Sequence, residues 1–142
     1  MRYCIGSVSK QFTAAAVLLL AEEGRLSLDD TVGQWLPDLT RAKDVSIRRL
    51  LSMTAGYQDY WPQDYVFPAM GVPTAPQGVP DQWACKPLDF EPGTKWQYSN
   101  SGFLLLGAIV EKVSGENYDN YVAARILKPA GMTSTGCFEM DI

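Results

Sequence analysis

The feature that most constrains the fold is an apolar segment near the start of the chain, where residues 14–21 are all alanine, valine or leucine. It lies within residues 7–23, which are rich in strong helix formers, and Gly24 is typical of the residue that follows a helix. A helix that is apolar on nearly every side must be covered by other elements. We therefore predict a central, buried helix over residues 7–23, with Ser7 or Ser9 as its N-terminal cap. Residues 14–21 are too few to cross a bilayer, so no membrane span is expected.

The rest of the chain also favours helices. Further helices are expected over residues 29–37, 47–53, 101–114 and 118–127. Residues 57–97 hold seven of the nine prolines and are too long for an ordinary connection, so they are expected to form a functional excursion with short helical pieces. Within it, Pro92 and Gly93 favour a type II turn. Only residues 3–6 and the tail from Thr135 have weak strand character, so the predicted fold class is mainly α.

The composition limits what the protein can do. Its 142 residues suit one domain over residues 1–142, and a net charge of −4 with scattered basic residues argues against a nucleic-acid partner. The chain contains no histidine, which excludes a Ser-His-Asp triad, a Cys-His pair and histidine metal sites. The three cysteines match no zinc spacing. One pair could form a disulfide if the protein is exported, but the simpler expectation is three free, mostly buried thiols. No metal and no organic cofactor is expected. Residues 1–5 lack the apolar region of a signal peptide.

Ser7 and Lys10 form the first candidate for chemistry. Residues three apart share a face of a helix, so the two side chains are expected to meet at the start of the apolar helix. A serine hydroxyl is a poor nucleophile until a base takes its proton, and a lysine that loses hydration can serve as that base. The simpler interpretation is that Ser7 caps the helix and Lys10 points into water. For an isolated S-x-x-K tetrapeptide this simpler interpretation is favoured, because such tetrapeptides are common by chance.

Tyr98 and Asn100 form the second candidate. A tyrosine beside a lysine ammonium can relay a proton, and an asparagine amide can both donate and accept hydrogen bonds to orient a substrate. The simpler interpretation is that Asn100 caps the next helix and Tyr98 packs in the core. Neither pair is decisive alone.

Taken together and in this order, the motifs resemble those of the penicillin-recognising serine hydrolases. This family includes class C β-lactamases, D-alanyl-D-alanine carboxypeptidases and family VIII carboxylesterases. The matching segments are residues 5–13 (IGSVSKQFT), 20–30 (LAEEGRLSLDD), 47–56 (IRRLLSMTAG), 90–102 (FEPGTKWQYSNSG) and 129–132 (PAGM). The resemblance implies that Ser7 is the acylated nucleophile, Lys10 its base partner, Tyr98 the proton relay and Asn100 a substrate-binding residue.

The resemblance also implies a truncation at both ends. Family members carry a third motif, K-T-G or a variant such as H-x-G, on a sheet strand after the Y-x-N motif, and strands before the S-x-x-K helix; neither is found here. We therefore expect the helical lobe of the β-lactamase-like fold, including residues 1–24 and 98–100, with most of the sheet missing. Many members also have a histidine where Met53 stands, which is expected to affect packing only. The family parent is often periplasmic or secreted.

The function predicted from this resemblance is acyl transfer through an acyl-serine intermediate. Esters or β-lactams are the first choice of substrate, and D,D-peptides are the alternative. The rival hypothesis is a catalytically silent helical fragment that acts by binding or assembly. Without the sheet, apolar helix surface would face water, so a homo-oligomer is expected.

Overall fold

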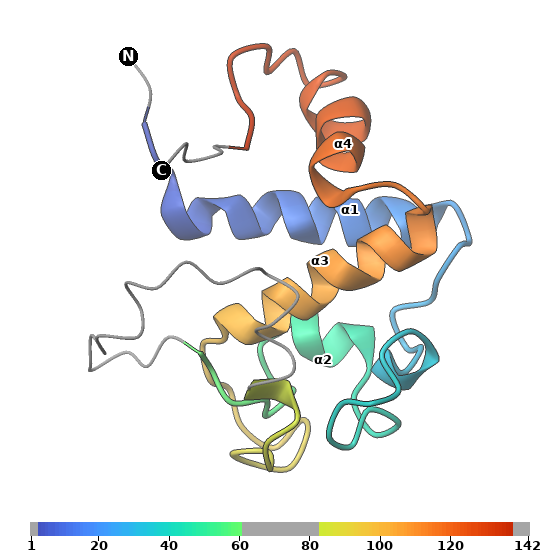
Figure 1. The fold of residues 1–142 in the computed structure, drawn as a ribbon, viewed down its shortest axis with the longest axis vertical. Coiled ribbons are helices and arrows are strands. Elements are labelled where there is room, and N and C mark those ends of the chain that lie inside the picture. The colour runs from blue at the N-terminus through green and yellow to red at the C-terminus, as the bar shows by residue number, and fades with distance from the viewer. Residues whose placement is uncertain (1–2, 61–82, 138–142) are drawn as a thin grey trace.

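The computed structural model describes residues 3–60 and 83–137, and these residues form a set of helices around one apolar core (Figure 1). The elements, in chain order, are the 3-10 turn η1 (Gly6–Ser9), α1 (Lys10–Glu22), the 3-10 turn η2 (Val32–Gln34), α2 (Ile47–Leu51), α3 (Asn100–Ser114), α4 (Tyr118–Val122) and the π-helical turn η5 (Ala123–Leu127). Within the described ranges there is no strand, only an isolated antiparallel bridge between Thr31 and Ser46. The expected mainly α fold is confirmed.

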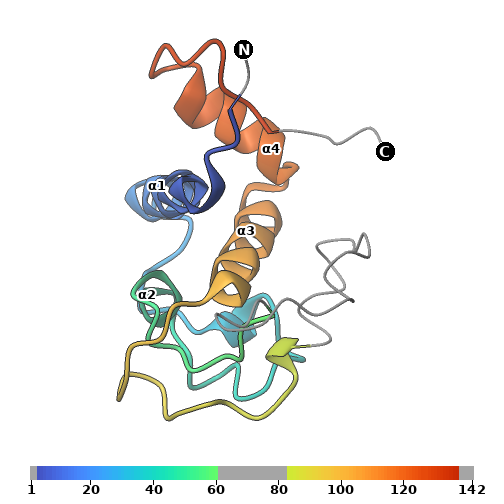
Figure 2. The same cartoon turned by 90° about the vertical axis from the view of Figure 1, so that its left-hand side faces the viewer.

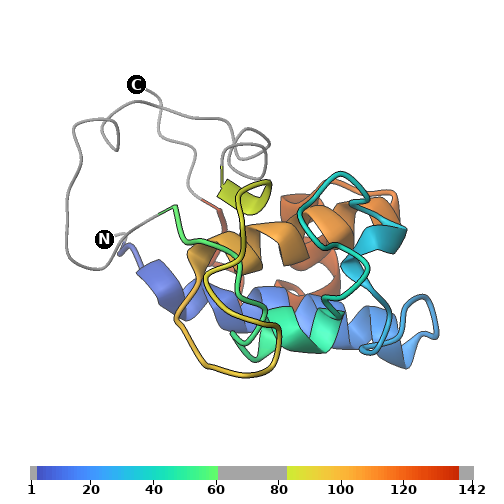
Figure 3. The same cartoon turned by 90° about the horizontal axis from the view of Figure 1, so that it is seen from below.

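Helix α3 lies at the centre of the packing, in contact with α1, α2 and α4 (Figures 1 and 3). Ser99 caps its start, because the Ser99 hydroxyl accepts from the backbone N–H of Gly102 at 2.9 Å. Gly115 ends it with a left-handed φ of 74°, which favours glycine. The buried face of the helix is formed mainly by Leu105, Leu106, Ile109 and Val110. The helix expected over residues 101–114 is therefore present almost as predicted.

The prediction of a fully buried first helix is wrong in two respects. The segment starts as the 3-10 turn η1 and becomes α-helical only at Lys10, and Ser9 makes no side-chain cap because its own backbone is already helical. Only one face of α1 is buried, through Thr13, Ala16, Val17 and Leu20, whereas Leu18 is 51% exposed. Figure 2 shows why: α3 and α4 both lie on one side of α1. No helix in residues 3–60 or 83–137 is long and apolar enough to cross a bilayer.

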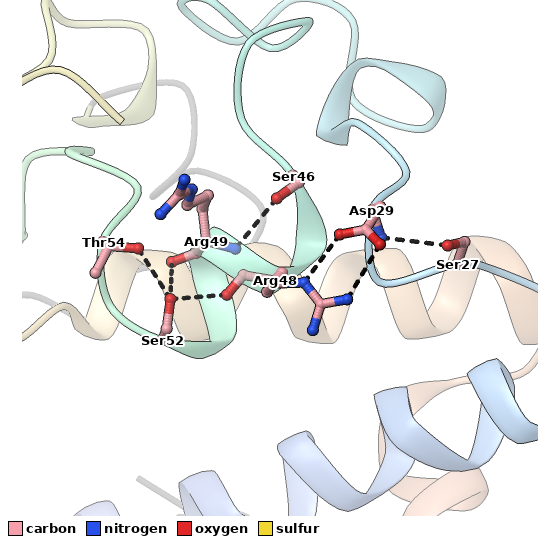
Figure 4. A network of polar contacts seen from close by, with 7 residues as sticks. All are labelled: Ser27, Asp29, Ser46, Arg48, Arg49, Ser52 and Thr54. Carbon is pink, nitrogen blue, oxygen red and sulfur yellow. Dashed lines mark hydrogen bonds and ion pairs between the residues drawn. The ribbon is translucent and has the colours of Figure 1, made fainter. Parts of the chain in front are cut away.

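Helix α2 is held at its two ends by a surface network of polar contacts (Figure 4). At its start, the Ser46 hydroxyl accepts from the backbone N–H of Arg49. The Arg48 guanidinium donates to both carboxylate oxygens of Asp29, at 2.9 and 3.1 Å, and this hydrogen bonding lowers the pKa of Asp29. At its end, the Ser52 hydroxyl bonds to the Arg48 carbonyl and to Thr54. Because the Arg48–Asp29 ion pair is exposed, it contributes little to stability.

Other expectations are corrected by the structure. The helix expected over residues 29–37 is reduced to the turn η2, and the last helix changes from α4 to the wider turn η5 at Ala123. The cysteines are exposed rather than mostly buried, because all three lie in irregular segments outside the helices. Residues 3–6 form no strand, because residues 3–5 are irregular and Gly6 is the first residue of η1.

The predicted turn at Gly93 is present, whereas most of the proline-rich excursion and of the tail cannot be compared with the structure. The turn around Gly93 is present, with a φ of 86° at Gly93 and a hydrogen bond from the Thr94 N–H to the Glu91 carbonyl at 3.1 Å. Most of the proline-rich excursion, residues 61–82, and most of the predicted tail strand, residues 138–142, lie outside the described residues.

Candidate active site

Ser7 and Lys10 meet because of the local backbone geometry. Ser7 lies inside η1 and Lys10 follows it as the first residue of α1. In a 3-10 turn, side chains three residues apart lie directly above one another. The Lys10 Nζ atom donates to the Ser7 Oγ atom at 3.1 Å. The two side chains are therefore in contact, as their spacing in the sequence predicts. The Ser7 side chain is exposed.

Tyr98 reaches the same serine from the segment before α3. Its hydroxyl donates to Ser7 Oγ at 2.5 Å, a short hydrogen bond. The Lys10 ammonium lies 4.8 Å from the centre of the Tyr98 ring and 5.8 Å from that of Phe103, so both rings favour its positive charge. Ser7 Oγ therefore has two proton-carrying partners. The interpretation of Tyr98 as a core residue does not hold, because its side chain is only partly buried and its hydroxyl points to Ser7.

Asn100 joins the cluster from the first turn of α3. Its Oδ1 atom accepts from Lys10 Nζ at 2.6 Å, which links the start of α3 to the start of α1. The helix cap is Ser99, so the interpretation of Asn100 as a cap is wrong. Lys10, Tyr98 and Asn100 are all half-buried, and they surround an exposed serine that a substrate could reach.

The charge of Lys10 affects the acidity of Tyr98. Burial raises the pKa of the phenol, but the hydrogen bonds to Lys10 and Ser7 and the Lys10 charge outweigh burial, so the pKa of Tyr98 is lowered from its usual 10.0. The phenolate form is therefore more accessible at neutral pH than in a free tyrosine. Such a group can take up and return the proton of a neighbouring hydroxyl.

One residue of the cluster was missed by the sequence analysis. Asp59 lies in the segment after Gly56, and its carboxylate accepts from the side-chain amide of Asn100 and from the backbone N–H groups of Asn100 and Ser101, each at 3.0 Å. Asp59 lies 41 residues before Asn100, so no helical spacing could have linked the two. The only sequence signal is an acidic residue in an aromatic and proline-rich segment.

Comparison with known proteins gives the family. The Beta-lactamase family profile matches residues 1–139. The chain is 38% identical over 133 residues to "Penicillin-binding protein 4*" of Bacillus subtilis (strain 168), covering 92% of this chain and 29% of that protein. The chain belongs to the Beta-lactamase family, whose members include serine hydrolases.

Solved structures agree with this assignment. The D-stereospecific amidohydrolase from Streptomyces sp. superposes with a TM-score of 0.83 at 35% identity, over 91% of this chain and 42% of that chain. The octameric penicillin-binding protein homologue from Pyrococcus abyssi gives a TM-score of 0.73 at 33% identity, over 92% of this chain and 32% of that chain. The helical fold is thus confirmed as part of the β-lactamase and penicillin-binding-protein fold, and this chain spans less than half of these proteins.

Proposed function

We propose that the chain carries the acylation site of a serine hydrolase, with Ser7 as nucleophile, Lys10 as its base partner, Tyr98 as proton relay and Asn100 as a substrate-binding residue. The observation that supports this most directly is that Ser7 Oγ has both Lys10 Nζ and the Tyr98 hydroxyl within hydrogen-bond distance. A nucleophile in contact with a base, which is itself oriented by a third group, is the arrangement that activates a serine. Here the third group is Asn100.

The proposed reaction follows from these contacts. The Ser7 proton passes to the pair formed by Lys10 and Tyr98 as Oγ bonds to the carbonyl carbon of the substrate. The bond from that carbon to the leaving oxygen or nitrogen then breaks, and the leaving group takes the proton from Tyr98. Water then attacks the acyl carbon and passes one proton to the pair formed by Lys10 and Tyr98. The bond from that carbon to Ser7 Oγ breaks, Oγ takes the proton from Tyr98, and the acid is released. The positive end of α1 lies beside Ser7 and favours the negative charge that develops on the acyl oxygen.

Esters or β-lactams are the proposed substrates, because they are reactive acyl donors that need little further activation. Amides or peptides of D-amino acids are the second choice, and the similarity to a D-stereospecific amidohydrolase supports this class. The rival hypothesis, a silent fragment that acts by binding or assembly, predicts that Ser7 is never acylated.

The lowered pKa of Tyr98 predicts how acylation depends on pH. If the phenolate accepts the Ser7 proton, the acylation rate should rise with pH through an inflection below 10.0 and then level off. Tyr98→Phe keeps the ring and removes the hydroxyl, so we expect a rate about 10²-fold lower and no such inflection. Rates measured by intact mass spectrometry across pH, with thermal melting as a control for folding, test this. An unchanged rate would leave Tyr98 as a structural residue.

Self-association is proposed through exposed apolar side chains. Leu18 on α1 is 51% exposed, and near the start of the chain Ile5 and Val8 are 46% and 56% exposed. Burial of apolar surface against a second copy stabilises by about 25 cal/mol per Å² before association costs. We expect sedimentation at micromolar concentration to show an oligomer, and Leu18→Lys to shift it toward monomer. A monodisperse wild-type monomer would contradict the proposal.

A further inference from the structure

Asp59 accepts hydrogen bonds from Asn100 and Ser101, and its two carboxylate oxygens have different partners. Its Oδ1 atom accepts from the backbone N–H groups of Asn100 and Ser101, both at 3.0 Å, and from the Ser101 hydroxyl at 3.3 Å. Its Oδ2 atom accepts from the side-chain Nδ2 of Asn100, also at 3.0 Å. The first oxygen therefore holds the backbone at the start of α3, and the second holds the Asn100 amide.

The second contact determines which way the Asn100 amide faces. A carboxylate only accepts hydrogen bonds and an ammonium only donates them. With Nδ2 on Asp59 and Oδ1 on Lys10 Nζ, the amide satisfies both neighbours. A flipped amide would place oxygen against oxygen at Asp59 and donor against donor at Lys10, so both bonds would be lost. Asp59 therefore selects the orientation in which Asn100 accepts from Lys10.

We propose that Asp59 is a positioning residue for the acylation reaction: by orienting the Asn100 amide, it holds the Lys10 Nζ atom on Ser7. This inference rests on the proposed function, because it assigns Asp59 a role in the same site. Lys10 Nζ lies 2.6 Å from Asn100 Oδ1 and 3.1 Å from Ser7 Oγ, so a change at Asn100 is passed directly to the nucleophile's partner.

A purely structural role must be separated from this one. Asp59 also satisfies two of the free N–H groups at the start of α3, while Ser99 satisfies the N–H of Gly102. Loss of either side chain should weaken the start of this helix. Only the loss of Oδ2 of Asp59 should also turn the Asn100 amide.

Asp59→Asn separates the two roles. The substituted side chain can keep its oxygen on the backbone N–H groups, and asparagine is a good residue at a helix start. Its NH₂ group then replaces Oδ2 and faces Asn100 Nδ2, so the Asn100 amide has to turn and present a donor to Lys10. The loss of the Asp59 charge should instead favour acylation. The pKa of Tyr98 is raised most by burial and further by the Asp59 charge. Neutralising Asp59 would therefore favour the phenolate.

The experiment compares wild type, Asp59→Asn and the matched control Ser99→Ala in the full chain. Acylation of Ser7 by a fluorophosphonate is timed by intact mass spectrometry, melting temperatures are recorded, and the Asn100 side-chain NH₂ signals are followed in ¹H–¹⁵N spectra. We expect Asp59→Asn to slow acylation by roughly 10- to 100-fold, because Lys10 Nζ would no longer be held correctly on Ser7. The Asn100 NH₂ signals should shift in the same variant. Ser99→Ala should melt at a lower temperature with the wild-type rate and wild-type signals.

Two results would overturn the inference: a wild-type acylation rate in Asp59→Asn, or Asn100 NH₂ signals that do not change in this variant. If wild type itself is never acylated, the proposed function fails for this chain. The NMR comparison alone then decides whether Asp59 orients Asn100, so the two failures are distinguishable.

Discussion

Replacing Lys10 with alanine is expected to slow acylation of Ser7 by about 10⁴-fold, the upper end of what a positioned acid or base supplies. The effect should exceed that of Tyr98→Phe, because Lys10 acts on three partners. Its Nζ atom contacts Ser7 Oγ at 3.1 Å and Asn100 Oδ1 at 2.6 Å, and its charge also lowers the pKa of Tyr98 against the opposing effect of burial. Its loss therefore removes the hydrogen-bond partner of Ser7 and also the group that makes the phenolate accessible.

Lys10→Arg is the matched control for charge. The guanidinium keeps the positive charge and a long side chain, but it does not release a proton in proteins. If Lys10 acts as a base, both variants should be slow at every pH. A rate close to wild type in Lys10→Arg would show that only the charge matters, and the proposed role of Lys10 as base would be wrong.

Local signals in the sequence were enough to predict part of the fold. Helix α2 follows Ser46, and Gly115 comes directly after α3, so a capping residue marks each of these boundaries. At the start of α3 the cap is Ser99 rather than Asn100, one residue from the expected position. The turn at Gly93 was predicted for the same reason, since its φ of 86° suits glycine. These features depend on residues close together in the chain.

Features that depend on distant segments were predicted less well. The apolar sequence of α1 indicated burial on all sides, yet Leu18 is exposed because α3 and α4 cover only one side of the helix. The composition of a helix indicates that its surface needs cover, but not how many neighbours supply it. The same limit applies to the cysteines, whose exposure depends on loops that the sequence pattern does not describe.

The candidate site shows the same division. The contact between Ser7 and Lys10 follows from their spacing, since both lie in one helical turn. The contact between Asn100 and Lys10 joins residues 90 apart. The family resemblance assigns both residues to one site, but no spacing in the sequence links them. Asp59 belongs to no recognised motif, and only the three-dimensional arrangement links it to Asn100.

Ser7→Ala is expected to abolish acylation completely, because no other group can replace the nucleophile. Ser7 Oγ is the atom on which Lys10 and Tyr98 converge, and the side chain is exposed to a reagent. Its substitution should have little effect on folding, since no residue of η1 is buried. Ser9→Ala is the matched control: Ser9 lies in the same turn and makes no side-chain cap. It should be acylated at the wild-type rate.

The most direct test of the proposed site is therefore the intact mass of the chain after exposure to a fluorophosphonate or a penicillin, followed by peptide mapping of the adduct. We predict one adduct per chain, on Ser7, in wild type and Ser9→Ala, and none in Ser7→Ala. An adduct on another residue, equal labelling of Ser7→Ala, or no labelling of the folded wild-type chain would contradict the assignment of Ser7 as the nucleophile of this chain.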